Sequence, residues 1–272
     1  MSHFYKVIVL SLSALAFISC NGGGATAPTD TNNTKKSSEQ NTTLKPTGTP
    51  ASIDVLVLYD REVKNAYSDI NTTVNHLFAV SNNIYKDSLL NITIHPKEIL
   101  FYDASTHPAL DEVAKDSAVQ ALREKYKADT VLVYQYNHSG GVGQCGVAYE
   151  AGAYDEPYQF KKAMYAQVEI NCPSDSTAHE IGHNMGLAHS HLQNGDNAKP
   201  YSYGLGHGVE GRFATVMAYA FRFHTNKQIP KFSSPNYNCV TGIPCGVAVG
   251  QKGEAFAVKV MRVTAPKIAK LY

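Results

Sequence analysis

The chain has 272 residues, of which 43% are hydrophobic and 17% are charged, and its formal net charge is +1. This is the composition of an ordinary globular protein. A nearly neutral chain carries no basic field to attract nucleic acid and no acidic field to attract a cationic partner, so we expect no nucleic-acid partner.

The N-terminus has the pattern of an export signal. Lys6 precedes an apolar run, Val7–Ile18, which is too short for a membrane-spanning helix of about 20 residues. The run ends in A-F-I-S-C, so Cys20 directly follows Ser19. This ending resembles the lipobox of bacterial lipoproteins, in which the cysteine becomes the lipidated first residue. We expect residues 1–19 to be a lipoprotein signal peptide, with a plain secretory signal or a retained anchor as alternatives.

Residues 20–50 are predicted to be the lipidated Cys20 followed by a disordered tether. Among residues 21–50 only Leu44 is large and apolar, so this stretch buries too little surface to offset the entropy of ordering it. Such a tether would hold a domain away from a membrane that only the N-terminal lipid touches. The predicted location is therefore the bacterial cell envelope, with the outer membrane as first choice, or the medium if the signal is plainly secretory.

Residues 51–272 are long enough for a single domain with its own core. Four cysteines lie in it, and an even number in an exported chain predicts two disulfides. Of three possible pairings we favour Cys145–Cys172 and Cys239–Cys245, because the second closes the short loop C-V-T-G-I-P-C. The four cysteines lack the paired C-x-x-C spacing of a zinc site.

Apolar β-branched runs predict five strands, and apolar residues at helical spacing predict helices between them. The expected strands are Ile53–Tyr59, Leu90–Phe101, Thr130–Tyr136, Gln144–Tyr149 and Met164–Ile170, and Pro96 suggests an edge or a bulge. The expected helices are Ser68–Asp87, Leu110–Tyr126, one that carries His179, and Gly253–Ala265. This order predicts an α/β (α+β) fold, in which helices pack on a twisted, mixed five-stranded sheet. An irregular C-terminal subdomain that ends in a helix would follow.

The segment H-E-I-G-H-N-M-G-L-A-H starts at His179 and has the spacing of a metal site. His179 and His183 lie four residues apart, so a helix places both imidazoles on one face as zinc ligands. Glu180 would stand beside the metal as general base for a zinc-bound water. Gly186 can end the helix in a left-handed conformation, after which His189 can return as third ligand. Three histidines and a water would form an open, catalytic zinc site.

The pattern H-E-x-x-H-x-x-G-x-x-H resembles that of the metzincin zinc endopeptidases. The resemblance implies one catalytic Zn²⁺ in a cleft, with the packed helices and the sheet above it. It also implies a tight turn with a methionine, the Met-turn, under the three histidines, and Met217 in T-V-M-A-Y fits this turn. Tyr219 stands where the astacin and serralysin branches have a tyrosine that steadies the transition state. Its alternative is a place in the wall of the specificity pocket.

Two further segments resemble reprolysin-like bacterial enzymes, which include the peptidyl-Asp metallopeptidase group. They are K-F-S-S-P-N, which starts at Lys231, and G-I-P-C-G-V, which starts at Gly242. The residue after the third histidine, Ser190, is instead the matrixin choice, so the branch stays open.

The resemblance also implies a protein or peptide substrate that lies extended along an edge strand. We assign this strand to four residues: Gly146, Val147, Ala148 and Tyr149. A Cys145–Cys172 disulfide would tie it to the start of the helix that carries His179.

The remaining histidines and two arginines near the Met-turn have weaker interpretations. We expect His191, His207 and His224 at the surface or around the ligands rather than on the metal. Arg212 and Arg222 flank the Met-turn, and either could attract an acidic substrate side chain, although most surface arginines only solvate a face.

The sequence therefore predicts an exported zinc endopeptidase that acts as a monomer. Two alternatives stay open. One is an inactive binding module or adhesin on a metzincin scaffold, against which the intact Glu180 argues. The other is a zinc amide hydrolase that acts on cell-wall peptides.

Overall fold

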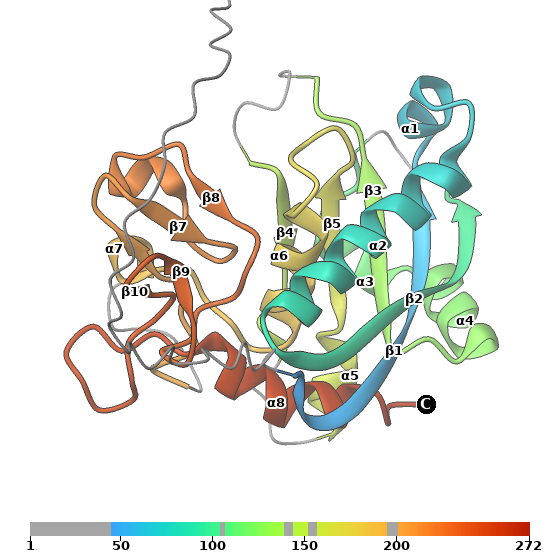
Figure 1. Cartoon of the computed structure of the whole chain (residues 1–272). Helices are drawn as coiled ribbons and strands as arrows, with labels where there is room; N and C mark the ends of the chain where they lie inside the picture. The colour runs from blue at the N-terminus through green and yellow to red at the C-terminus, as the bar shows by residue number, and fades with distance from the viewer. Residues whose placement is uncertain (1–44, 104–106, 139–143, 152–156, 195–200) are drawn as a thin grey trace, which may run out of the picture. The chain divides into compact units, whose positions relative to one another are not determined.

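A five-stranded sheet lies at the centre of the computed structural model (Figure 1), in the order β2-β1-β3-β5-β4. The first four strands in this order are parallel to their neighbours, and β4 is antiparallel to β5. The predicted mixed five-stranded sheet is therefore confirmed. The strands are β1 (Thr47–Tyr59), β2 (Leu90–Phe101), β3 (Thr130–Gln135), β4 (Gly146–Ala148) and β5 (Tyr165–Glu169).

The structure describes residues 45–103, 107–138, 144–151, 157–194 and 201–272, all of which belong to the unit Thr43–Tyr272. The predicted signal peptide, Cys20 and the tether up to residue 44 lie outside the described residues. Within the described ranges, no helix has the length and apolar character needed to cross a membrane.

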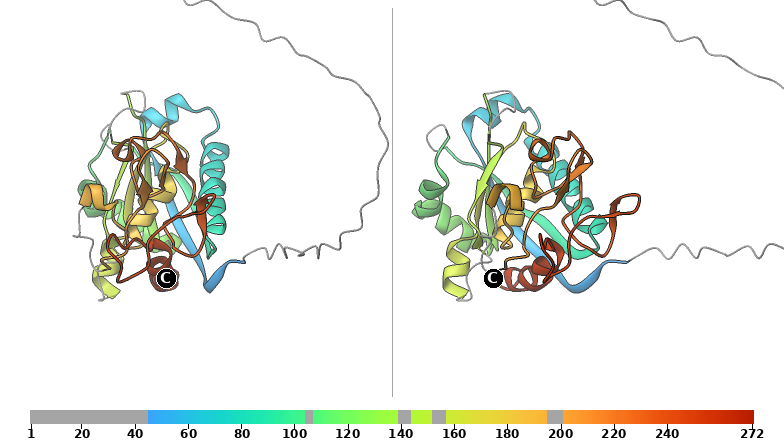
Figure 2. Two further views of the ribbon diagram at one scale, coloured as in Figure 1. Left: turned by 60° about the vertical axis from the view of Figure 1, so that its left-hand side comes forward. Right: turned by 90° about the vertical axis from the view of Figure 1, so that its left-hand side faces the viewer.

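Helices cover both faces of the sheet (Figures 1 and 2). Along β1, the side chains of Ile53, Val55 and Val57 face one buried cluster, while Leu56 and Leu58 face the other. The first cluster receives apolar residues from α2 (Ile70–Asp87), α6 (Ser176–Asn184) and α8 (Ala257–Ile268). The second receives them from α3 (Leu110–Lys115) and α4 (Ser117–Tyr126). Burial on both faces explains why the parallel strands are continuously apolar in sequence.

The sheet differs from its prediction at its start and agrees at Pro96. β1 begins four residues before the expected domain start at Ala51, and the Thr47 amide donates to the Leu89 carbonyl at 3.1 Å. Residues 47–50 are therefore part of a strand and not of the tether. β2 is an edge strand, and the register shifts between Pro96 and Glu98, so it has both features that Pro96 suggested.

The segment Leu110–Tyr126 was predicted to be one continuous helix, and this is wrong. The segment is divided at Asp116 into α3 and α4. Asp116 has an extended conformation, and its carboxylate accepts hydrogen bonds from the Ala118 amide at 2.8 Å and the Tyr102 hydroxyl at 2.7 Å. An aspartate that caps a new helix in this way competes with the backbone bonds of a continuous one.

Other helices differ from the prediction in length or existence. The last helix was expected at Gly253–Ala265, but α8 begins only at Ala257, because Gly253 has a φ of +77° that is not helical. The α8 helix continues to Ile268 with Pro266 in its last turn. The helices α1 (Arg61–Ala66) and α5 (Pro157–Lys162) were not predicted, since six residues are too few to show a period.

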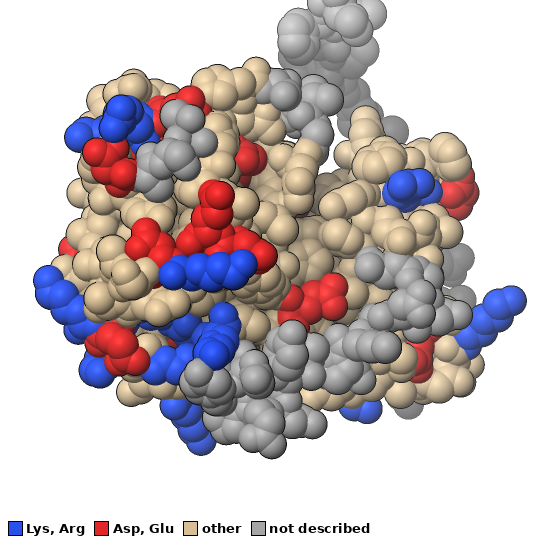
Figure 3. All heavy atoms as spheres, turned by 180° about the vertical axis from the view of Figure 1, so that it is seen from behind, with Lys and Arg blue, Asp and Glu red and all other residues tan. Residues whose placement is uncertain are grey.

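The region after α6 is mostly irregular, as predicted, and it ends in α8. Small strands form a three-stranded sheet and a hairpin in this region. A view of the whole molecule from behind shows positively and negatively charged side chains intermingled on its surface (Figure 3). The elements are α7 (His191–Asn194), β6 (Gly208–Val209), β7 (Phe213–Thr215), a 3-10 helix (Ala220–Phe223), β8 (Gln228–Ile229), β9 (Asn238–Val240) and β10 (Ile243–Pro244).

Both favoured disulfides are present. Cys145 pairs with Cys172 across Cα atoms 5.7 Å apart, and Cys239 pairs with Cys245 across 4.7 Å. The first joins the residue before β4 to the loop that leads into α6. The second closes the β9–β10 hairpin.

Replacing Asp116 by alanine removes the acceptor that separates α3 from α4. We expect the free energy of unfolding to fall by about 1–2 kcal/mol, the usual cost of losing a helix cap. Urea unfolding followed by circular dichroism measures it. Ser117→Ala at the exposed neighbouring position should change it by less than about 0.5 kcal/mol. Equal stabilities of the two variants would contradict the capping role.

Candidate active site and metal centre

Helix α6 places His179 and His183 side by side, one turn apart, with ring centroids 4.9 Å apart. Each ring donates its Nδ1 hydrogen to a backbone carbonyl. His179 donates to Val216 at 2.8 Å, and His183 donates to Leu187 at 2.7 Å. These bonds fix the tautomer, so that the Nε2 atom of each ring keeps its lone pair for a metal.

Gly186 ends the helix as predicted, with a φ of +89°. The Gly186 amide donates to the His183 carbonyl at 2.8 Å, and the Leu187 amide donates to the Gly182 carbonyl at 3.1 Å. These two bonds form a Schellman motif, whose C′ position has the left-handed conformation that glycine adopts without strain. The chain leaves the helix axis at this point and returns toward the face that carries the histidines.

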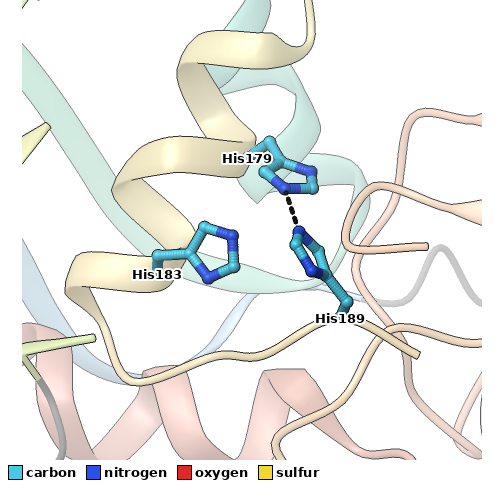
Figure 4. Close-up of side chains that lie close together, drawn as sticks. All are labelled: His179, His183 and His189. Carbon is cyan, nitrogen blue, oxygen red and sulfur yellow. Dashed lines mark hydrogen bonds between the residues drawn. The ribbon is translucent and has the colours of Figure 1, made fainter. Parts of the chain in front are cut away.

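The returning chain places His189 opposite the two helical histidines (Figure 4). Its Nε2 atom lies 3.1 Å from Nε2 of His179, and one nitrogen from each of the three rings lies within 4.8 Å of the others. The sequence-predicted trio is thus brought together. Burial lowers the pKa of His179 to about 4 and that of His183 well below its usual value, so both rings are neutral near pH 7.

Glu180 lies beside this trio, against the edge strand β4. Its side chain is only 5% exposed, its Oε2 atom has no hydrogen-bond partner among the described residues, and burial raises its pKa to about 8. A Cβ atom at Gly146 would lie 2.5 Å from Oε1 of Glu180. Glycine at this position therefore makes the space that the carboxylate occupies.

Met217 lies in a tight turn beneath α6, where the Met-turn was expected. The Ala218 amide donates to the Thr215 carbonyl at 2.8 Å, which closes the turn, and Met217 is fully buried. Its Sδ atom would be 2.9 Å from a Cβ atom at Gly182. The turn therefore packs directly on the helix, and its Val216 carbonyl is the one that orients His179.

Tyr219 follows this turn and lies beside the histidines. Its ring centroid is 4.7 Å from that of His189 and 6.1 Å from that of His179. The side chain is 40% exposed, and its backbone amide donates to Gln193 at 3.1 Å. Burial, with the nearby charge of Glu180, raises the pKa of the Tyr219 hydroxyl.

The four residues assigned to the substrate strand form the edge next to Glu180. Gly146, Val147 and Ala148 make up β4, which pairs with β5 only among the described residues, and Tyr149 follows directly. The Val147 side chain is exposed. The Cys145–Cys172 disulfide ties the start of this strand to the loop before α6.

Asn184 is a site residue that the sequence did not reveal. It is fully buried at the end of α6, and its side-chain amide donates to the carbonyls of Tyr149 and Tyr165, both at 2.9 Å. Its Oδ1 atom accepts a bond from the Thr130 hydroxyl at 3.1 Å. These bonds attach the end of α6 to β3, to β5 and to the residue that follows β4. A polar residue within the motif was the only signal, and helical polar residues are too common to single out.

The other histidines lie apart from the trio among the described residues. His191 bonds to the Glu254 carbonyl at 2.8 Å, and His224 pairs with Glu210 at 2.6 Å at the surface. His207 is buried enough for its pKa to fall to about 4.

The two arginines differ in their relation to the site. The Arg222 guanidinium lies 5.4 Å over the ring of Phe221, which stacks on Tyr219 at 5.7 Å. Arg212 is exposed at the turn between β6 and β7. Only Arg222 is thus joined to the site by described contacts.

The sequence matches the family described as Metallo-peptidase family M12B Reprolysin-like over residues 49–250. The chain belongs to this family. A "Peptidyl-Asp metalloendopeptidase" from Pseudomonas aeruginosa is 32% identical over 245 residues, which cover 81% of the chain and 40% of that relative. This reprolysin-like metallopeptidase thus spans less than half the length of the relative it matches.

Among solved structures, the fold is similar to a chain in "Structure of a chaperone-substrate complex", with a TM-score of 0.63 and 23% sequence identity. The match covers 82% of the metallopeptidase described here and 39% of that chain. At this identity the likeness supports the fold alone.

Replacing Gly186 by alanine forces a side chain into the left-handed conformation that returns His189 to the trio. We expect the free energy of unfolding to fall by about 1 kcal/mol and the zinc affinity to fall about tenfold or more. Gly211→Ala is the matched control, because Gly211 has a φ of +62° with no atoms near its Cβ position. It should lose similar stability with unchanged zinc affinity in a competition titration with a chromogenic chelator. Equal zinc affinities of the two variants would contradict the role of Gly186.

Proposed function

We propose that the chain is a zinc-dependent endopeptidase. The observation that carries the proposal is the convergence of His179, His183 and His189 beside a buried carboxylate, Glu180, at the open edge of the sheet. Membership of a metallopeptidase family supports it independently.

The residues fit a catalytic zinc ion. Three neutral imidazoles are a preferred zinc donor set, and two of them are already oriented by backbone carbonyls. Three protein ligands leave a position for substrate or water. When bound, zinc supplies a Lewis acid that polarises the scissile carbonyl and lowers the pKa of water.

Glu180 moves the proton. The Oε2 atom, which has no protein partner among the described residues, takes a proton from the attacking water. The same carboxyl group then donates that proton to the nitrogen of the leaving amine. Burial of Glu180 raises the pKa of its carboxyl group, which helps the group hold the proton between the two steps, and a cation at the histidines would act in the opposite direction.

The edge strand β4 holds the substrate. Its outward-facing backbone groups can pair with an extended peptide, which adds a strand to the sheet. Because Gly146 lies against Glu180, a peptide bound there has its backbone close to the general base. Substrate main chain rather than one particular side chain would thus provide much of the binding, as suits an endopeptidase.

An acidic residue next to the scissile bond is the specificity we propose. The name of the Pseudomonas aeruginosa relative refers to peptidyl-Asp bonds. In this chain, Arg222 is joined to Tyr219 through the exposed ring of Phe221, which places a cation near the histidines.

We further propose that the enzyme is exported and anchored to the cell envelope through Cys20, on the pattern of the N-terminal sequence. The tether would leave the peptidase unit free to reach protein substrates outside the cell. It would contact the membrane only through its lipid.

Glu180→Gln is the test of the catalytic proposal. We expect zinc content to stay unchanged while cleavage of a denatured proteome by the unit Thr43–Tyr272 falls by about 10²–10⁴-fold, because amides are poor proton acceptors. Glu98→Gln on β2, at the opposite sheet edge, should retain full cleavage. If the wild-type unit binds zinc and cleaves no more than Glu180→Gln, the chain is a binding module. The cleavage map from the wild type also shows whether acidic residues flank the cut.

Cys20→Ser tests the anchor. In a bacterial host fed a labelled fatty acid, the wild-type chain should carry the label and sediment with membranes, because Cys20 is the proposed point of lipid attachment. The variant should lose the label and leave the membrane fraction. An unlabelled wild-type protein in the medium would instead indicate plain secretion.

A further inference from the structure

A second group of metal-ligating side chains lies outside the site described above. It consists of Glu62, in the first turn of α1, and two histidines from separate loops, His107 and His138. The Oε2 atom of Glu62 accepts hydrogen bonds from Nε2 of His107 at 2.8 Å and from Nε2 of His138 at 2.6 Å. One donor atom from each residue lies within 4.8 Å of the others, as in the catalytic trio.

The parallel sheet brings this group together. Asp60 and Glu62 follow β1, His138 follows β3, and Glu169 is the last residue of β5. The three strands are parallel, so these side chains lie at the carboxyl edge, where ligands of open α/β sheets usually bind. His107 reaches the same edge from the loop that precedes α3.

Two more carboxylates near the group each have one oxygen without a hydrogen-bond partner among the described residues, although Oδ1 of Asp60 accepts a bond from the Val63 amide at 2.8 Å. Asp60 is 1% exposed, and its Oδ2 atom has no hydrogen-bond partner among the described residues, nor has Oε2 of Glu169. The Glu169 carboxyl group interacts electrostatically with Asp60, Glu62, His107 and His138. Buried carboxylate oxygens without a hydrogen-bond partner are costly, and a cation close to them would offset that cost.

We propose that Glu62, His107 and His138 bind a second divalent transition-metal ion, with zinc as its most suitable occupant. Two imidazoles and one carboxylate are a known zinc donor set, whereas calcium and magnesium prefer ligands that are all oxygen. An N–H group of each histidine points at the same carboxylate oxygen of Glu62. The ion takes the place of those hydrogens.

The group is open to solvent, so an ion can reach it. His138 is largely exposed, and the side chains of His107 and Glu62 are partly so. Its residues are all different from the trio on and after α6. This inference is therefore independent of the proposed peptidase activity.

The second ion would hold one side of the substrate region. His107 lines a cavity of about 170 Å³ that also borders Gly146 and Val147 of β4. The neighbouring Pro108 carbonyl accepts bonds from the side chains of Gln135 at 2.8 Å and Gln167 at 2.5 Å. The ion would join α1 and the loop after β3 to this already anchored segment beside the substrate strand.

Metal stoichiometry tests the proposal without an activity measurement. The full-length chain, purified without a polyhistidine tag, is stripped of metal, equilibrated with buffered Zn²⁺, desalted and analysed by mass spectrometry of the metal. We expect about two zinc ions per chain in the wild type, and about one in each of Glu62→Gln and His107→Gln. His95→Gln, an exposed histidine on β2, is the matched control and should keep about two.

His179→Ala separates the two sites. We expect His179→Ala to lose the ion at the histidine trio and to keep the ion at the second site. The double variant His179→Ala with Glu62→Gln should lose both. Loss of all zinc in His179→Ala, or unchanged zinc in Glu62→Gln, would overturn the second site and leave the peptidase proposal standing. Conversely, a wild type whose single ion survives in His179→Ala but is lost in Glu62→Gln would support the second site against the first. Circular dichroism of each metal-free variant confirms that it folds.

Discussion

The left-handed turn at Gly186 is the constraint on which the metal centre depends. It ends α6 at Asn184, one residue after His183, and satisfies two of the last helical carbonyls through the Gly186 and Leu187 amides. The same Leu187 residue then offers its carbonyl to the ring of His183. One short segment therefore ends the helix, orients the second histidine and returns the third. A longer helix would carry His189 away from the other two rings.

Around this turn, the site is assembled from glycines that allow close packing. Gly182 lets the Met217 side chain press against α6, and Gly146 lets the Glu180 carboxylate press against β4. The Met-turn supplies the carbonyl that orients His179, and Asn184 bonds the far end of α6 to the sheet. Two of the three histidines and Glu180 thus lie on one helix, which packs against both the open strand β4 and the Met-turn. Such fixed geometry is what the proposed role of Glu180 as general base requires.

The sheet topology explains why a second group of ligands lies so near the first. Parallel strands place Asp60, His138 and Glu169 at one edge, and the short antiparallel strand β4 extends the same sheet toward Glu180. A protein with an all-antiparallel sheet would distribute these residues over both ends. The histidine trio, the proposed second metal site and the proposed substrate strand therefore share one end of the fold.

The sequence left three disulfide pairings possible, of which the structure contains the favoured one. By itself it determined the five strands of the central sheet, the long helix α2 and the trio with its neighbouring glutamate. These features follow from local spacing, since a period of two or four residues and a glycine at a fixed offset need no distant partner to be recognised. Only the tertiary structure decided where Asp116 divides a helix, that Gly146 touches Glu180, and that Asn184 joins α6 to the sheet. It alone brought Glu62, His107 and His138 together, from three segments with no common motif. Such contacts arise from strand order and packing between residues far apart in the chain, which no local pattern records.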